Sequence, residues 1–397
     1  MYDESRPAAA GGPLTPAGRL ARLRLIRSRR VGPQTFHRLM AEHGSAEAAL
    51  DALPDIAAAA GVRGYAVCTH DAAEAEIEAG FRAGARLICH GEPGYPVPLM
   101  DLVDAPPVLW ALGHPRTAAQ PMVAMVGARN ASSLGIRMAR RLAEGLGQAG
   151  HTVVSGLARG IDAAAHQAAL PTGTIAVMPG GVDRIYPEEN AKLAGDIARD
   201  GLRLSEHPPG TVPQARHFPL RNRLISGLAQ AVIVVEAAAK SGSLITARAA
   251  LDQGREVMAV PGHPFDARAS GCNMLIRDGA ALVRGPDDVA EALSAARSPA
   301  QADLFAEDAA PPQPARSLHE APAAPPCAPA APPTAVPMPA DLQARILTLL
   351  GAAPVAEDQL IRDLALPTAM VTGAVLALEL DGSVARQPGG LLARAQG

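Results

Sequence analysis

The sequence predicts an α/β fold in which a mainly parallel sheet is covered by helices on both faces, with a smaller helical unit before it and another after it. Two observations predict the sheet. Apolar strand-like runs alternate with helical stretches between residues 122 and 262, and these runs are continuously apolar, as expected for strands that are buried on both faces. A third observation, an Ala/Pro-rich segment, separates this body from the C-terminal unit.

The strands and helices of the body follow one another in a regular order. Strands are expected at 122–128, 151–158, 174–181, 202–206, 231–237 and 255–262. Helices are expected from the first strand to about Gln148, at 161–170 and at 243–254. This βα alternation indicates one sheet, whose ligands would sit at the carboxyl ends of the strands.

Composition shifts divide the chain into five segments. We expect a disordered tail, a small helical domain, the α/β domain, an Ala/Pro-rich linker and a small helical module at residues 1–16, 17–83, 84–295, 296–340 and 341–397. The N-terminal helices are interrupted at the turn-like stretches VGP and GVRG. The linker is dominated by Ala and Pro, which favours an extended, semi-rigid tether.

Charge and cysteine usage exclude several classes of protein. The chain has 397 residues and a formal net charge of -3, so it is no polycation and any anion-binding surface must be local. Its four cysteines show no CxxC spacing, which favours a reduced cytoplasmic protein over a disulfide framework or a zinc site. No apolar stretch is long enough to span a bilayer, and the N-terminus does not resemble an export signal. We therefore expect a cytoplasmic protein without a membrane partner or a metal.

Glycines and small hydroxyl residues gather where the strands end. The stretches VGARNASSLG, SGLARGID, PGGVDRIYPEEN and VEAAAKSGSLITA each precede a helix, whose free backbone amides favour an anion. One such loop can equally reflect tight packing between strand and helix. Several loops with cations nearby indicate an anion-binding edge, at Arg129, Arg159, Arg184, Lys192 and Lys240. The motif GxGxxG is absent after the first strand, which argues against NAD.

The stretch RHFPLRNRLISGL, residues 216–228, brings three arginines and an aromatic ring to the same edge, namely Arg216, Arg221, Arg223 and Phe218. Pro219 and the pattern after it predict a helix that starts near Arg221. The guanidiniums would bind phosphates in fork geometry, and the phenyl ring offers a flat face for a base. In the alternative, the arginines pair with Glu206 or Glu236 and the ring belongs to the core.

Seven stretches resemble, in this order, the successive motifs of the DprA/Smf family, the DNA-processing proteins of bacterial natural transformation: VGARNASSLG, SGLARGIDAAAH, PGGVDRIYPEEN, HFPLRNRLISGL, VVEAAAKSGSLITA, GREVMAVPG and GCNMLIRDGA. The resemblance implies an extended Rossmann-like, doubly wound domain with a SAM-like N-terminal domain and a winged-helix-like C-terminal domain. It also implies a homodimer that binds and protects incoming single-stranded DNA and helps to load the RecA recombinase. No cofactor and no catalytic residue are implied.

The resemblance assigns DNA contacts position by position. Arg129 matches the arginine of the family's GxR motif and would contact a phosphate, and Phe218 would stack on a base. Leu134 stands where the family usually has an aromatic residue, so no stacking contact is assigned there. The full set of expected DNA-binding residues is Arg129, Ser132, Ser133, Gly135, Gly156, Arg159, Gly160, Arg184, Lys192, Arg216, Phe218, Arg221, Asn222, Arg223, Lys240, Ser241, Gly242 and Ser243.

Two other classes of function stay open. The PGG loop resembles that of Rossmann-type nucleotide phosphoribohydrolases, although their GGxGT continuation is missing; release of a free base from a nucleoside monophosphate would identify such an enzyme. A pure interaction scaffold would show no salt-sensitive retention on single-stranded DNA. Asp162 and His166 lie one helical turn apart. Without a nucleophile or a metal-ligand set beside them, they are interpreted as a capping aspartate and a packed histidine.

The two flanking units raise separate questions. An arginine cluster before the VGP turn forms either an auxiliary phosphate contact or a solvated basic face, and consists of Arg19, Arg22, Arg24, Arg27, Arg29 and Arg30. Residues 341–397 show three amphipathic helical stretches and a possible wing, but carry 4 Lys and Arg against 6 Asp and Glu, which would repel DNA. The third helix is more apolar than one core-facing stripe needs. We therefore expect a protein-interaction or regulatory module held at variable distance by the linker.

Overall fold

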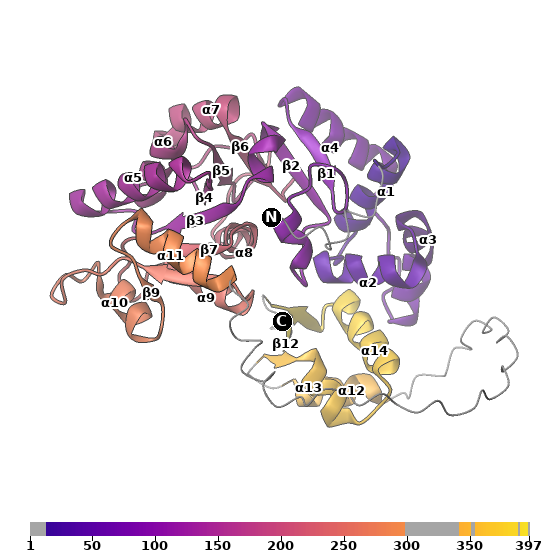
Figure 1. Ribbon diagram of the computed structural model, residues 1–397. Helices are drawn as coiled ribbons and strands as arrows, with labels where there is room; N and C mark the ends of the chain where they lie inside the picture. Colours follow the sequence, from indigo (N-terminus) through magenta and orange to yellow (C-terminus); the bar gives the residue numbers. More distant parts are fainter. Residues whose placement is uncertain (1–12, 298–340, 351–353, 388–389, 396–397) are drawn as a thin grey trace, which may run out of the picture.

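The computed structural model (Figure 1) describes most of the chain, namely residues 13–297, 341–350, 354–387 and 390–395. Its central body is the expected α/β domain, with helices on both sides of a large sheet. Most of the predicted tail and nearly all of the predicted linker lie outside the described residues. Among the helices that are described, none has both the length and the apolar character needed to cross a membrane.

The N-terminal domain is helical, as predicted. Its helices are α1 (Pro16–Arg27), α2 (Pro33–His43), α3 (Ala46–Ala59) and α4 (His70–Arg82). Thr15, Ser45 and Thr69 cap α1, α3 and α4, because their hydroxyl groups accept hydrogen bonds from backbone amides in the first turn. Gly44 ends α2 in the left-handed conformation, with a φ of 77°. The polar caps thus fix where α1, α3 and α4 begin, and α1 already starts at the last residue of the predicted tail.

A nine-stranded sheet lies at the centre of the body, in the order β1-β2-β6-β5-β4-β3-β7-β8-β9. The strands are β1 (Arg86–Cys89), β2 (Val108–Gly113), β3 (Met122–Val126), β4 (Thr152–Ser155), β5 (Thr174–Val177), β6 (Leu202–Ser205), β7 (Ala231–Val234), β8 (Glu256–Ala259) and β9 (Ala281–Leu282). Neighbours from β6 to β9 are parallel, which confirms the six predicted strands. The sequence pattern missed β1 and β2. These strands pair antiparallel, so no crossover helix follows them and the βα alternation does not reveal them.

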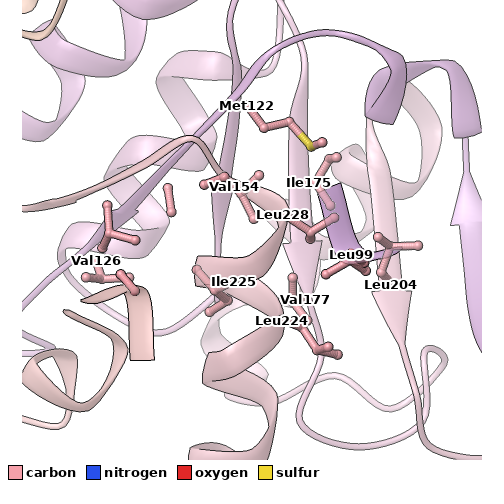
Figure 2. Close-up of a cluster of buried hydrophobic side chains, with 14 of the residues drawn as sticks. Leu99, Met122, Val126, Val154, Ile175, Val177, Leu204, Leu224, Ile225 and Leu228 are labelled. Carbon is pink, nitrogen blue, oxygen red and sulfur yellow. The ribbon is translucent and has the colours of Figure 1, made fainter. Parts of the chain in front are cut away.

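Helices cover both faces of the sheet, which explains why its strands are continuously apolar. α8, α9 and α10 lie on one face, and α5, α6, α7 and α11 on the other. Along β3, Met122 and Val126 pack toward α8, whereas Val123 packs toward α5. Figure 2 shows the first of these clusters, in which Leu224 and Leu228 of α8 lie against the strands. The helices are α5 (Ser133–Gln148), α6 (Ile161–Ala169), α7 (Ala191–Asp200), α8 (His217–Leu228), α9 (Ser243–Asp252), α10 (Ser270–Arg277) and α11 (Pro286–Arg297).

The chain reverses its direction of winding at β3. β4, β5 and β6 follow on one side of β3, whereas β7, β8 and β9 follow on the other side. The connections after β3 and β7 therefore diverge, and they leave a crevice at the carboxyl ends of these two neighbouring strands. Doubly wound sheets bind their ligands at such a switch point.

The C-terminal module is a winged helix, as predicted. β12 pairs antiparallel with β11 in the wing, and β10 pairs with the other edge of β12. Leu342, Leu360 and Val375, one from each helix, meet in its core. The elements are α12 (Leu342–Leu349), β10 (Val355–Ala356), α13 (Glu357–Leu364), α14 (Thr368–Asp381), β11 (Val384–Arg386) and β12 (Leu391–Arg394).

The third helix of this module, α14, packs on the N-terminal domain (Figure 1). Leu376 and Leu380 join the buried apolar cluster of α1, α2 and α3. Glu379 accepts a hydrogen bond from Arg38 of α2 at 3.3 Å, and Arg30 donates to the backbone carbonyl of Leu380. The surplus apolar residues of α14 are therefore buried within the chain. This corrects the expectation of a module that keeps them exposed and is held at variable distance.

Candidate nucleic-acid interface

A cavity of about 620 Å³ occupies the crevice at the ends of β3 and β7. Eight of the residues expected to bind DNA line it, namely Arg129, Phe218, Arg221, Asn222, Lys240, Ser241, Gly242 and Ser243. A second cavity of about 500 Å³ adjoins it and is lined by Gly156, Arg159 and Tyr186. Arg129 and Phe218 line both cavities, so they stand between the two.

Arg129 and Phe218 form a ridge between these cavities. The guanidinium carbon of Arg129 lies 5.4 Å from the centre of the Phe218 ring, within the range of a cation–π interaction. The ring of Tyr186 meets Phe218 edge to face, with 5.6 Å between the ring centroids. Arg129 and Tyr186 are exposed, whereas Phe218 is half-buried. An exposed cation above an aromatic pair can contact a phosphate and an adjacent base together.

Arg221 lies beneath the larger cavity. α8 begins at His217, so the prediction that it starts near Arg221 was wrong and this arginine falls within the helix. Its guanidinium donates to the backbone carbonyls of Gly156 and Val177 at 2.8 and 2.5 Å. A Cβ atom on Gly156 would lie 2.4 Å from that guanidinium, so glycine makes the space. Burial lowers the pKa of Arg221 to about 10 and Asp162 opposes the shift, which leaves the cation charged at neutral pH.

Asp162 and His166 serve the structure of α6. The carboxylate of Asp162 accepts a hydrogen bond from the backbone N–H of Gly156 at 3.1 Å. Burial raises the pKa of Asp162, while Arg221 favours its charged form. Nδ1 of His166 lies 2.7 Å from the hydroxyl oxygen of Thr174, and burial lowers the pKa of His166 to about 3. These contacts agree with the interpretation of a packed histidine. The interpretation of a capping aspartate was wrong, because the cap residue of α6 is Gly160 and Asp162 instead binds amides of the loop after β4.

Ser132 and Gly135 shape the loop that carries Arg129. The hydroxyl of Ser132 accepts a hydrogen bond from the N–H of Gly135 at 2.9 Å and donates to Glu236 at 3.0 Å. A Cβ atom on Gly135 would lie 2.0 Å from the same carboxylate. Ser133 is exposed in the first turn of α5. These three predicted contacts lie outside both cavities, so their geometry suits a positioning role.

The connection from β7 to α9 brings further anion-binding groups to the larger cavity. Its residues precede or begin α9, and the amides of Leu244 and Ile245 already donate to the carbonyls of Ser241 and Gly242, at 3.1 and 3.2 Å. The hydroxyl oxygens of Ser241 and Ser243 lie 2.7 Å apart, and Lys240 is exposed beside them. Two hydroxyls and an ammonium group therefore meet at one wall of the cavity.

Arg223 is buried among carboxylates and lines neither of these two cavities. Its Nε lies 3.4 Å from Asp104, and its second guanidinium nitrogen pairs with Glu206. The structural alternative therefore holds for this arginine, because its donors are already used. Lys192 and Arg184 also pair with nearby aspartates. Neither cavity is lined by Gly160, Arg184, Lys192 or Arg216.

Gly160 is explained by close packing. Its φ is 74°, and a Cβ atom there would lie 2.3 Å from the carbonyl oxygen of Ala128. Glycine alone fits this left-handed position without displacing the backbone after β3. This geometry favours tight packing between strand and helix as the reason for a glycine at this position.

Arg268 is a lining residue that the sequence analysis missed. It follows β8 and lines the same cavity as Lys240. Its Nε lies 3.4 Å from the carboxylate of Glu236, which also accepts from Ser132. One carboxylate thus ties the loops after β3, β7 and β8 together. Arg268 could have been considered from the sequence, because it follows the strand predicted at 255–262. The sequence pattern does not show, however, that this strand lies next to β7 in the sheet.

The arginines of α1 bind protein groups. Arg22 donates to the backbone carbonyl of His90 at 2.6 Å. Arg27 makes two hydrogen bonds of 2.9 Å with Glu76 and a third with the backbone of Glu206 in the α/β body. These hydrogen bonds hold the N-terminal domain together and attach it to the α/β body. They argue against both alternatives for the cluster, an auxiliary phosphate contact and a solvated basic face.

Known families match along the whole of this architecture. The DNA recombination-mediator protein A family matches residues 86–294. The DprA-like N-terminal HHH domain matches residues 16–79, and the DprA winged helix domain matches residues 321–390. The first of these matches covers more than half of the chain and contains every residue of the two cavities.

Individual relatives agree with the family match. DNA processing protein DprA of Bacillus subtilis is 46% identical over 202 residues, which are 50% of this chain and 68% of the relative. Protein Smf of Synechocystis is 37% identical over 310 residues, 75% of this chain and 77% of the relative. The X-ray structure of DprA from Streptococcus pneumoniae is similar with a TM-score of 0.57 and 33% identity, over 70% of this chain and 98% of that chain. The chain therefore belongs to the DprA/Smf family of DNA-processing proteins.

Proposed function

We propose that the two adjoining cavities bind single-stranded DNA. The observation that carries this proposal is the ridge of Arg129 and Phe218, with a lysine and the start of α9 on one side of it. The larger cavity is lined by four cations, Arg129, Arg221, Lys240 and Arg268. Its one acidic lining residue, Asp162, is buried. Arg268 also pairs with Asp266 and Glu236, and Arg221 lies near Asp162, so Arg129 and Lys240 are the lining cations without an ion pair among the described residues. These two cations make the cavity suited to a polyanion.

The shape of the site favours unpaired bases over a duplex. Phe218 is half-buried between two hollows, so a flat partner must enter a cavity to reach its ring. Bases of a single strand can splay out and stack on such a ring, whereas bases of a duplex are stacked on one another. The cations would hold the backbone phosphates, independently of sequence and with a strong dependence on salt.

The wider role is inferred from family membership. We propose that the bound strand is DNA in uptake and transformation, and that this protein acts as a cytoplasmic homodimer that protects the strand and helps to load RecA recombinase. The family description as a recombination mediator supports this role. We propose binding without cleavage, because Asp162 is buried and already accepts a backbone hydrogen bond, so it is poorly placed as a base.

Fluorescence polarisation with labelled oligo-dT and with a hairpin duplex of equal length tests the proposal at two salt concentrations. The wild type should prefer oligo-dT. Arg129→Ala should weaken binding by about 10- to 100-fold, as expected for a charge-assisted hydrogen bond. Arg248→Ala removes an exposed arginine of α9 that pairs with Asp252, and should not change the affinity. Equal binding of duplex, or full affinity of the Arg129→Ala variant, would refute the proposal.

A further inference from the structure

The loop that follows β8, residues 260–269, extends the carboxyl edge beyond the larger cavity. β8 is the neighbour of β7, so this loop lies next to the connection that carries Lys240. The side-chain amide of Asn273 in α10 exchanges two hydrogen bonds with the backbone of Gly262, at 3.1 and 3.0 Å. The loop is therefore anchored on the body of the domain.

Phe265 projects from this loop and is 95% exposed. Its backbone N–H donates to Nδ1 of His263 at 3.3 Å, and the two rings lie 5.6 Å apart between centroids. Nearly the whole ring is accessible to solvent. Its exposure does not stabilise the fold, because apolar side chains contribute to stability when they are buried. The anchored loop thus presents a flat apolar face to solvent.

Arg268 links this exposed ring to the proposed DNA site. Its guanidinium lines the larger cavity and pairs with Asp266 at 3.1 Å and with Glu236 at 3.4 Å. Glu236 also accepts hydrogen bonds from the N–H and the hydroxyl of Ser132, in the loop of Arg129. The loop of Phe265 and the loop of Arg129 are therefore held by the same carboxylate.

We propose that Phe265 is a stacking platform for a base of the DNA strand that leaves the larger cavity across Lys240 and Arg268. This inference rests on the proposed binding of single-stranded DNA and extends its path. Aromatic and cationic groups then follow the strand order β5-β4-β3-β7-β8, from Tyr186 to Phe265. Four strand intervals span about 19 Å along the sheet edge. Base stacking at an exposed ring is sequence-tolerant, as general binding of single strands requires.

Phe265→Ala tests the platform by affinity. Oligo-dT binding should weaken about five- to tenfold, at the low end for loss of a base–aromatic stack. The salt dependence should stay unchanged, because no phosphate contact is lost. With an oligonucleotide of abasic sites, wild type and variant should bind equally. Phe81→Ala removes a ring of α4 that is 72% exposed and lies in the N-terminal domain, and should keep the parent affinity.

Phe265→Trp tests the contact directly by fluorescence. The chain holds a single tryptophan, Trp110, which is 1% exposed and donates to Glu76. Saturating oligo-dT should quench the emission of the new indole in Phe265→Trp, and should leave the emission of the wild type and of Phe81→Trp unchanged. Quenching in Phe265→Trp alone supports the platform.

The outcomes separate this inference from the proposed function. If the wild type fails to bind oligo-dT, the proposed function fails and the platform with it. If the wild type binds and Arg129→Ala weakens binding, yet Phe265→Ala keeps the parent affinity and Phe265→Trp is not quenched, the platform alone is overturned.

Discussion

Helix α1 and the carboxyl edge of the sheet are both rich in cations, but they use them in opposite ways. In α1, Arg19 donates to Glu92 at 2.8 Å, and Arg24 donates to the carbonyl of Cys68 at 3.0 Å. At the edge, Arg129 lies over an aromatic ring, and it forms no ion pair with the described residues. The difference teaches that arginine density in a sequence does not predict an anion site. Nearby carboxylates and unpaired carbonyls decide whether a guanidinium stays available.

Helix α8 shows the same contrast within three positions. Arg223 has two carboxylate partners, Asp104 before β2 and Glu206 after β6. Arg221 donates to backbone carbonyls and lines the floor of the cavity. Arg221 borders the cavity with only the buried Asp162 opposing its charge, whereas Arg223 pairs with two carboxylates outside both proposed DNA cavities.

Arg223→Ala is expected to have the largest effect on stability. The substitution leaves Asp104 and Glu206 without their shared cation, which should lower the free energy of unfolding by about 3 kcal/mol. Oligo-dT affinity of the folded variant should not change. Denaturant titration measures the loss, and Arg216→Ala, at an exposed neighbour, should shift stability by less than about 0.5 kcal/mol. If a folded Arg223→Ala variant bound oligo-dT more weakly, Arg223 would belong to the DNA interface and would not differ from Arg221 in role.

Arg27→Ala should come next. It removes both hydrogen bonds to Glu76, a carboxylate that also accepts from the indole of Trp110, and should cost about 2 kcal/mol. Unfolding can be followed by the fluorescence of Trp110. Affinity for oligo-dT should stay at the parent value, because α1 offers no free phosphate contact through this residue. Arg29→Ala, an exposed neighbour, is the control and should leave both measurements unchanged. A tenfold weaker complex of the folded Arg27→Ala variant would show that α1 touches DNA.

Ending the chain at residue 297 should expose the surface on which α14 packs. Loss of Leu376 and Leu380 from the N-terminal core should speed up amide hydrogen exchange in α2 and α3. Oligo-dT affinity should fall by less than tenfold, because no proposed phosphate contact is removed. This limit corresponds to a loss of about 1.4 kcal/mol in binding free energy. Glu379→Gln in the full chain weakens the pair with Arg38 and should show a smaller change in the same helices. Unaltered exchange in α2 and α3 would contradict the docked arrangement.

Lys240→Gln should have the smallest effect of these substitutions. The test has a matched control, because the chain has two lysines and only one of them lines the cavity. The substitution should reduce the slope of log affinity against log salt by about 0.7, the value for one phosphate contact with a single strand. Thermal stability should not change. Lys192, which is 91% exposed on α7 and pairs with Asp196, provides the matched control. Equal slopes for Lys240→Gln and Lys192→Gln would remove Lys240 from the interface.

The amino-acid sequence by itself determined the features that depend on neighbouring residues. Apolar runs and βα alternation predicted the parallel strands, because both faces of such strands must be buried. The glycine and serine residues at the start of α9 predicted a wall of the cavity, because the loop between a parallel strand and the next helix lies at the carboxyl edge of the sheet. The family motifs added Arg129 and Phe218, which line the site.

Tertiary structure alone decided what depends on residues far apart in the chain. Arg223 meets Asp104 across 119 positions, and Arg30 meets Leu380 across 350. No local pattern records such partners, because a guanidinium has the same sequence signature whether its donors face a carboxylate or a cavity. The order of the strands likewise brought Arg268, from the loop after β8, to the same cavity as Lys240. Local sequence preferences determined the helices and strands. Contacts between residues far apart in the chain determined which charged side chains are paired and which are available to a ligand.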